Sequence, residues 1–135
     1  MSAERFQLDI VTPEGVVVST EVDEVVVPGP EGEFGVLQGH APFLVLLDVG
    51  EVRYPTDQGV ERLAVAHGFA EVTPESVTIL AERCERPDEI DAERARAALA
   101  RAEVRLVGDT TEIDHARAEA AYRRAQNRIR MAAEE

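Results

Sequence analysis

The chain has 135 residues, which is enough for one ordinary domain or for one compact domain with a small appendage. Its formal net charge of −13 argues against a general nucleic-acid binder. It has one cysteine, no basic and apolar N-terminal start and no long apolar run. We therefore expect no internal disulfide, no signal peptide and no transmembrane helix.

Residues 1–87 alternate short β-rich runs with turn signals. In the first run, Phe6, Leu8 and Ile10 alternate with more polar neighbours, which is the period of a half-buried strand. The runs occupy residues 6–11, 16–18, 22–27, 34–37, 43–47, 51–54, 62–66, 69–72 and 77–81. Turn-forming clusters separate several of them, at residues 13–15, 55–59 and 73–76. Short strands at this spacing predict a β-sandwich or a flattened barrel.

A glycine-rich stretch, VVVPGPEGEFGVLQGHAPF, covers residues 25–43. The spacing of its glycines fits neither the dinucleotide-binding fingerprint nor the P-loop. Glu31 and Glu33 lie inside it and would repel a phosphate. The residues alone therefore predict a set of tight turns, in which glycine supplies positive φ.

After Pro87 the pattern becomes helical. Residues 92–107 contain no glycine or proline, Asp91 can cap their N-terminus, and Gly108 ends the run. Thr111 can cap a second helix from 112 to about 133. Apolar stripes are expected at Ala95, Leu99, Ala102 and Leu106, and at Ile113, Ala116, Ala120, Ala125, Ile129 and Ala132. Alanine-rich stripes favour an antiparallel helical hairpin over residues 88–135.

The sequence shows no catalytic constellation. His40, His67 and His115 lie in three different contexts and have no metal-ligand spacing. No nucleophile elbow and no paired cysteine occur, and Cys84 is expected to be a half-buried thiol at a strand end. We therefore expect neither a catalytic residue nor a metal site.

The arginines of the two predicted helices repeat one spacing. Residues at i, i+7 and i+11 share a helix face, and this spacing occurs in each helix. The first set is Arg94, Arg101 and Arg105, and the second is Arg117, Arg124 and Arg128. Two interpretations stay open: a solvated basic face, or an anion site between the helices, for which bidentate arginine is well suited.

The glycine-rich stretch, Gly50, the stretch GFAEVTPESVTILAE at 68–82 and the stretch EIDAERARAAL at 89–99 closely resemble the epsilon subunit of bacterial F-type ATP synthases. The resemblance covers nearly the whole chain. It departs slightly at His67-Gly68, where the family commonly has Gly-Gly. It implies an N-terminal ten-stranded β-sandwich (residues 1–87) followed by a C-terminal antiparallel α-helical hairpin (residues 88–135).

The resemblance also implies a function. The chain would be a non-catalytic rotor subunit that couples proton translocation to ATP synthesis, at the cytoplasmic face of the bacterial inner membrane and peripheral to it. Its sandwich would bind the gamma subunit and the ring of c subunits. Glu31 and Glu33 fall in the segment that matches the ring contact, and His40 falls near the stalk interface. Its hairpin would reach the catalytic α/β subunits and inhibit ATP hydrolysis.

Some bacterial members of the family bind ATP in the folded hairpin, through a motif I/L-D-x-x-R-A and later arginines. The matching residues here are Ile90, Asp91, Arg94, Ala95, Arg101, Arg117, Arg124 and Arg128, with Glu85 upstream. The resemblance therefore implies ATP as a regulatory ligand and no catalytic cofactor. Two alternatives stay open: the same subunit acting in coupling without binding ATP, and, more remotely, an unrelated sandwich adaptor or enzyme with a helical tail.

Overall fold

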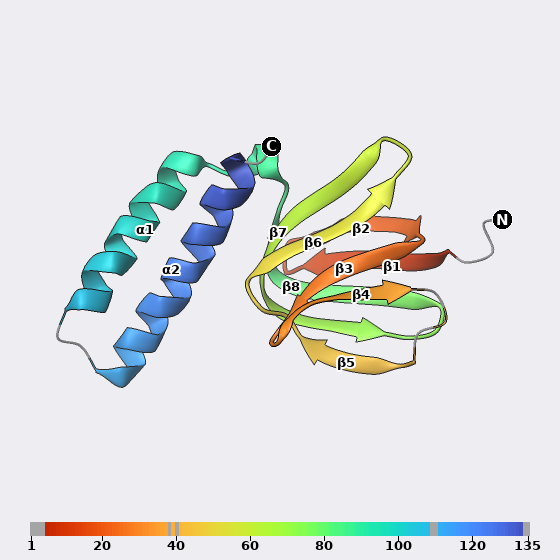
Figure 1. The fold of residues 1–135 in the computed structure, drawn as a ribbon, viewed down its shortest axis with the longest axis horizontal. Coiled ribbons are helices and arrows are strands. Elements are labelled where there is room, and N and C mark those ends of the chain that lie inside the picture. The colour runs from red at the N-terminus through yellow and green to blue at the C-terminus, as the bar shows by residue number, and fades with distance from the viewer. Residues whose placement is uncertain (1–4, 38, 40, 109–110, 134–135) are drawn as a thin grey trace. The chain divides into compact units, whose positions relative to one another are not determined.

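The computed structural model describes residues 5–37, 39, 41–108 and 111–133. The chain forms two compact units, Met1–Glu85 and Arg86–Glu135. The first unit is built from strands and the second from helices (Figure 1).

Eight strands make up the described part of the first unit. They are β1 (Phe6–Thr12), β2 (Gly15–Val22), β3 (Glu24–Gly29), β4 (Gly32–Leu37), β5 (Phe43–Leu46), β6 (Gly50–Thr56), β7 (Gly59–Val72) and β8 (Ser76–Glu85). Hydrogen bonds connect them in the order β2-β1-β8-β7-β6-β3-β4, and β5 pairs with β7. The β1–β8 pair is parallel and the other pairs are antiparallel. The sheet is therefore mixed.

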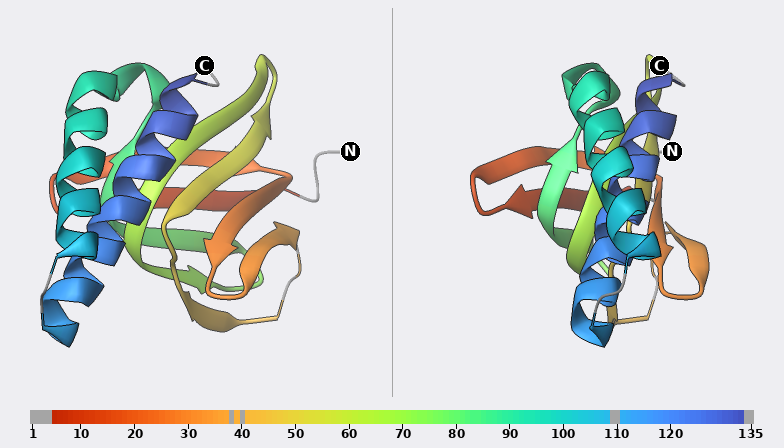
Figure 2. Two further views of the ribbon diagram at one scale, coloured as in Figure 1. Left: turned by 60° about the vertical axis from the view of Figure 1, so that its left-hand side comes forward. Right: turned by 90° about the vertical axis from the view of Figure 1, so that its left-hand side faces the viewer.

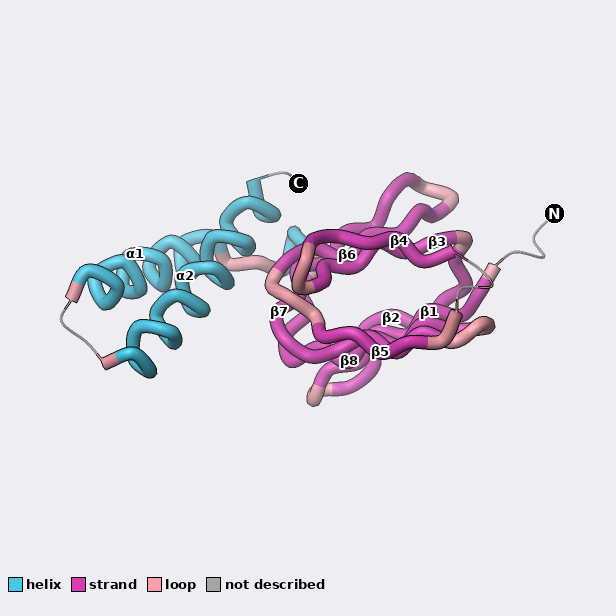
Figure 3. Tube along the Cα trace, turned by 60° about the horizontal axis from the view of Figure 1, so that its bottom comes forward, coloured by secondary structure: helices cyan, strands magenta, loops and turns pink. Residues whose placement is uncertain are grey.

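The strands fold into the two layers of a β-sandwich, which confirms the predicted fold class. Figure 3 shows β3, β4 and β6 in one layer and β1, β2, β5 and β8 in the other. Apolar side chains from both layers meet between them and form one core, in which Leu8, Val27, Val52, Leu63 and Ile79 have no exposed surface. These residues alternate with outward-facing ones along each strand, as the sequence period requires.

The long strand β7 belongs to both layers. Along one edge, its residues 59–65 pair with β6 and its residues 69–72 pair with β5. His67 has φ +63° and Gly68 has φ +117°, so the strand changes direction between these two segments. The runs predicted at 62–66 and 69–72 are consequently one strand. The nine β-rich runs therefore correspond to the eight strands that the described residues form. The ten strands that the resemblance implied were wrong.

The second unit contains a short 3-10 helix, η1 (Pro87–Glu89), and two α-helices, α1 (Ala92–Val107) and α2 (Glu112–Ala133). Figures 1 and 2 show α1 and α2 side by side and antiparallel, which confirms the predicted hairpin. The Asp91 side chain accepts a hydrogen bond from the Arg94 N–H at 3.1 Å, and the Thr111 hydroxyl accepts one from the Asp114 N–H at 3.2 Å. Both predicted N-caps are therefore formed.

Two details of the hairpin differ from expectation. Gly108 is extended (φ −82°) and its N–H donates to the Arg105 carbonyl, so the helix does not end in a left-handed glycine. The predicted stripe on α2 is also shifted, because Ile113 and Ala116 are exposed whereas Ala118 is buried. An alanine-rich helix offers several similar stripes, and the pattern alone does not choose between them.

Candidate functional site

The acidic pair of the glycine-rich stretch occupies two different kinds of structure. Glu31 is exposed in the turn between β3 and β4, where Gly32 has φ +120°. Glu33 lies in β4 itself and pairs with Pro28 of β3. The sequence predicts tight turns before a β-rich run at 34–37. Glu33 instead already lies on the strand, because residues 32–37 pair with β3. The other residue predicted for partner binding, His40, lies outside the described residues.

The carboxylate of Glu33 accepts two hydrogen bonds from an arginine on a strand that is not adjacent to β4. Arg53 of β6 donates from Nη1 to Glu33 Oε2 at 2.7 Å and from Nη2 to Oε1 at 3.0 Å. Strand β3 lies between β4 and β6, so Arg53 reaches across two strand spacings, about 9.6 Å. A parallel, two-point contact of this kind fixes the orientation of the carboxylate as well as its position.

The contact continues into a line of alternating charges. Arg62 of β7 donates to Glu51 from Nη2 at 2.7 Å and from Nε at 3.1 Å, and Arg53 Nη1 lies 3.6 Å from Glu51 Oε2. We call Glu33, Arg53, Glu51 and Arg62, in this order, the charge ladder. Its side chains become less exposed from Glu33 (47%) to Glu51 (5%), and Arg62 at the far end is 27% exposed.

The register explains why the charge ladder alternates. Arg53 and Arg62 lie directly opposite each other on β6 and β7, and like charges in this position repel. Glu51 is two residues from Arg53 on the same face of β6 and contacts both guanidinium groups, which compensates the repulsion. The hydrogen bond to Glu33, and then the charges of Glu33 and Glu51, raise the pKa of Arg53, although partial desolvation opposes them. Arg53 therefore remains charged at any physiological pH.

Three of the six arginines on the predicted faces line one groove of the hairpin. It has a volume of about 580 Å³ and is lined by Arg105 of α1 and by Asp114, Arg117, Ala118, Ala120, Ala121 and Arg124 of α2. Of the candidate ATP-binding residues, it brings together Arg117 and Arg124. The alanines leave room beside the guanidinium groups, which suits an anion larger than a single carboxylate.

The other candidate residues of the hairpin lie outside the lining of this groove. Asp91 caps α1, and Arg94 contributes its backbone N–H to that cap while its side chain is exposed. Ile90 and Ala95 are buried. The remaining two are also on the helices: Arg101 is exposed on α1, and Arg128 is half-buried on α2.

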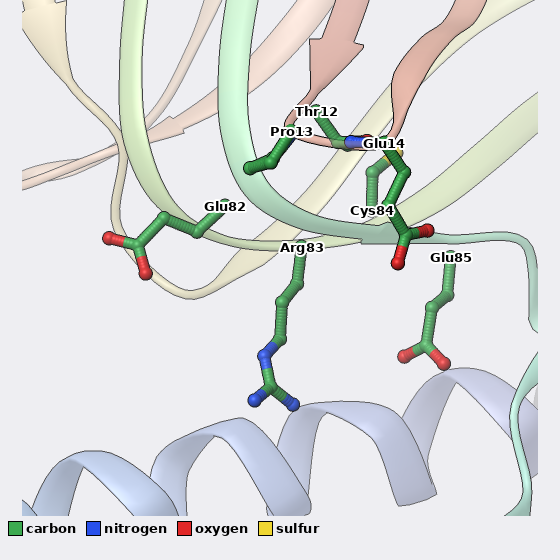
Figure 4. Close-up of a pocket in the computed structure, with 7 residues that line it drawn as sticks. All are labelled: Thr12, Pro13, Glu14, Glu82, Arg83, Cys84 and Glu85. Atoms are coloured by element: carbon green, nitrogen blue, oxygen red, sulfur yellow. The ribbon is translucent and has the colours of Figure 1, made fainter.

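Glu85, the last candidate, belongs to the sandwich unit. It lines a separate pocket of about 360 Å³ with Glu82, Arg83 and Cys84 of β8 and with Thr12, Pro13 and Glu14 near the β1–β2 turn (Figure 4). Figure 4 shows the Arg83 and Glu85 side chains leaving β8 in the same direction, as expected two residues apart on a strand. Cys84 is half-buried, as predicted.

Sequence reasoning missed the partners of Glu33 and part of the groove. Glu51, Arg53 and Arg62 were not recognised as candidates, although two of them alternate on β6 in the way that one outer face requires. Arg105 shares the i, i+7, i+11 spacing and was seen as part of the face, but only the structure shows that it lines the groove.

Two kinds of feature are absent from the described residues. No helix among them is both long enough and apolar enough to cross a membrane. Within the same residues, no three histidine, cysteine or acidic side chains are grouped in a way that could hold a metal ion.

Two family descriptions together cover almost the whole chain. Residues 5–87 match "ATP synthase, Delta/Epsilon chain, beta-sandwich domain", and residues 88–133 match "ATP synthase, Delta/Epsilon chain, long alpha-helix domain". Similar curated proteins include the ATP synthase epsilon chain of Syntrophobacter fumaroxidans, 51% identical over 96% of this chain and 97% of that protein. The epsilon chain of Desulforapulum autotrophicum is 53% identical, over 94% and 95% of the two chains.

Similar solved structures come from mitochondrial ATP synthases. A chain in the Euglena gracilis OSCP/F1/c-ring structure has a TM-score of 0.81 and 23% identity, over 97% of this chain and 82% of that one. A chain in the Tetrahymena thermophila central stalk/c-ring structure has a TM-score of 0.71 and 10% identity. Because both identities are below 25%, the similarity to these two structures supports the fold alone.

Proposed function

The chain belongs to the ATP synthase delta/epsilon family, as an epsilon subunit in the central stalk of an F-type ATP synthase, and we propose that it transmits rotation between the membrane ring and the catalytic head. In this role it performs no chemistry of its own. The sandwich binds the gamma subunit and the c-subunit ring, and the complex holds the chain at the cytoplasmic side of the membrane. Family membership over both units is the observation that carries this proposal.

Glu33 is the residue through which we propose the sandwich engages the ring. Its carboxylate is half exposed and faces outward, whereas its neighbours Phe34 and Val36 turn toward the core. An outward carboxylate on a strand is held more rigidly than one on a free loop, and a rigid contact transmits force without yielding. Glu31, exposed in the adjoining turn, adds negative charge at the same end of the β3–β4 hairpin.

We further propose that the hairpin binds ATP and inhibits ATP hydrolysis. The groove between the helices carries this part of the proposal, because Arg105, Arg117 and Arg124 gather around it. Three guanidinium groups and one carboxylate, that of Asp114, line this groove, so its local charge is positive and favours an anion. A triphosphate balances more of this positive charge than a diphosphate does, so ATP is preferred over ADP. Bound ATP stabilises the hairpin in its folded state.

Release of the nucleotide gives the hairpin its inhibitory role. The helices have 16 and 22 residues, which correspond to lengths of about 24 and 33 Å. An extended hairpin of this length reaches far along gamma, where its basic face suits acidic segments of the catalytic α/β subunits. The alternative is a hairpin that serves coupling alone and binds no nucleotide.

Calorimetric titration of the full chain with ATP tests the nucleotide proposal. We expect heat of binding and a raised melting temperature with ATP, and weaker effects with ADP. Arg105→Ala, Arg117→Ala and Arg124→Ala should each weaken binding, because all three arginines line the groove. Arg130→Ala is the matched control, since Arg130 hydrogen-bonds Asn127 on the same helix and does not line the groove. No heat and no melting shift at millimolar ATP would reject nucleotide binding by the hairpin.

A further inference from the structure

We propose that the charge ladder is a positioning device, in which Arg53 holds the Glu33 carboxylate in the orientation that the ring contact requires. Arg53 is a positioning residue and acts through Glu33. This inference rests on the proposed role of Glu33 in coupling. It adds three residues that neither the motifs nor the comparisons assign: Arg53, Glu51 and Arg62.

The first step is the geometry of the Glu33–Arg53 contact. Both carboxylate oxygens of Glu33 accept from Arg53, at 2.7 and 3.0 Å. Glutamate has three rotatable side-chain bonds, and a half-exposed glutamate normally samples many rotamers. Two parallel hydrogen bonds restrict it to one. The exposed part of the Glu33 side chain then keeps a fixed direction.

The second step is the anchoring of Arg53 itself. A long arginine side chain that crosses an intervening strand is mobile unless something holds it. Glu51 lies 3.6 Å from Arg53 Nη1 and is almost completely buried, and Arg62 grips Glu51 with two hydrogen bonds. The charge ladder therefore connects Glu33, on the edge strand β4, with the inner strands β6 and β7 of the sheet.

Arg53 crosses an outer face of the sheet that includes a glycine of β4. Its stem crosses β3 near Val26, which is the residue of β3 that pairs with Arg53. Gly35 of β4 pairs with the same Val26, and a Cβ added at Gly35 would have only Glu24 Oε2 nearby, at 4.0 Å. Because Gly35 has no side chain, no side chain projects from this position of the outer face beside Glu33.

The charge ladder differs from an ordinary surface ion pair. A surface ion pair between exposed side chains contributes little to stability, and Arg5–Asp23, at 3.3 Å and with both side chains well exposed, is of that kind. The charge ladder differs because it is bidentate at both ends and runs into a buried carboxylate. Networks of this kind are the ones that fix geometry.

The test measures protons pumped per ATP hydrolysed in membranes that carry the complete ATP synthase with this subunit. The variants are Glu33→Gln, Arg53→Met, the double variant and Arg53→Lys, with Arg5→Met as the matched control that removes an arginine from an ion pair elsewhere. We expect Glu33→Gln and Arg53→Met to lower the ratio by a similar fraction, and the double variant to be no worse than either. Arg53→Lys should lie below the wild type, because lysine keeps the charge but loses the two-point grip. Arg5→Met should leave the ratio unchanged.

The outcomes separate the inference from the proposal on which it rests. A loss with Glu33→Gln but none with Arg53→Met would overturn the positioning role and leave the ring contact intact. Additive losses in the double variant would also overturn it, because Arg53 would then act independently of Glu33. No loss with Glu33→Gln would instead reject the proposed ring contact. If Arg53→Met fails to assemble, the reduced ratio of Arg53→Lys decides, and a full ratio there contradicts the inference.

Discussion

At the scale of single residues, Gly68 is the position with the least tolerance for a side chain. Its φ of +117° is a conformation that other residues rarely adopt, and an added Cβ would lie 1.9 Å from the Leu80 carbonyl oxygen of the paired strand. We expect Gly68→Ala to lower the free energy of unfolding by more than Gly59→Ala. Gly59 has a similar φ of +125° but open space around it, so its variant pays only backbone strain, about 1–3 kcal/mol. Urea unfolding of both variants measures the difference, and equal losses would contradict the clash.

Glu51 provides a second test at this scale, because it is an almost fully buried acid. Arg62→Met removes the two hydrogen bonds at 2.7 and 3.1 Å and should lower the free energy of unfolding by about 3 kcal/mol. The double variant Glu51→Met/Arg62→Met removes the buried charge as well, and it should recover much of that loss. Urea unfolding again decides. A double variant less stable than Arg62→Met would mean that Glu51 is stabilised mainly by other contacts.

The partner of Glu33 shows what a sequence cannot supply at the residue scale. The composition of the stretch and the family resemblance both single out Glu33. Arg53 lies 20 residues away and reaches it only because β6 pairs with β3 at Val26, which is one topology among several that nine short β-rich runs allow. The alternation of side chains along β6 is enough to place Glu51 and Arg53 on one face of the sheet. It does not predict that Arg53 lies opposite Arg62, because that depends on the register between β6 and β7.

At the scale of elements, the cap of α1 separates two roles of Asp91. The side chain accepts from the Arg94 N–H, and it is also part of the motif that resembles the ATP site. We expect Asp91→Ala to destabilise the hairpin by about 1 kcal/mol, and Asp91→Asn, which retains a capping oxygen, to cost much less. Hydrogen exchange in the first turn of α1 measures this, and Thr111→Ala at α2 is the control.

Nucleotide binding by the same two variants then completes the test. If Asp91 acts only as a cap, Asp91→Asn binds ATP as the wild type does. If its charge contacts the ligand or orients an arginine, Asp91→Asn loses affinity while its helix remains intact. An unfrayed first turn in Asp91→Ala would show that the cap contributes nothing to α1.

Helix bounds were predictable from sequence and strand bounds less so. Both helices have the expected limits, since Asp91 and Thr111 are strong start signals. Strand β7 was split in two because His67-Gly68 resembles a turn, and only its pairing with β6, β5 and β8 shows that the strand continues. Long-range pairing decides such cases, whereas a helix is decided locally.

At the scale of the whole molecule, the sandwich carries its own core. The buried apolar cluster consists of residues between Phe6 and Ala81, all in the first unit. We therefore expect a chain that ends at Pro87 to fold and to assemble with the ATP synthase. Without the hairpin, its complex should hydrolyse ATP faster than the complex with the full chain. Steady-state hydrolysis at limiting ATP measures this. Equal inhibition by the two chains would assign inhibition to the sandwich.

We propose that this chain transmits rotation between the catalytic head and the membrane ring. The most direct measurement is proton pumping per ATP hydrolysed, in membranes rebuilt with and without the subunit while the other subunits are held constant. We predict that membranes with the full chain couple hydrolysis to pumping, and that membranes without it hydrolyse ATP and pump few protons. An equal number of protons per ATP in the two preparations would contradict the claim.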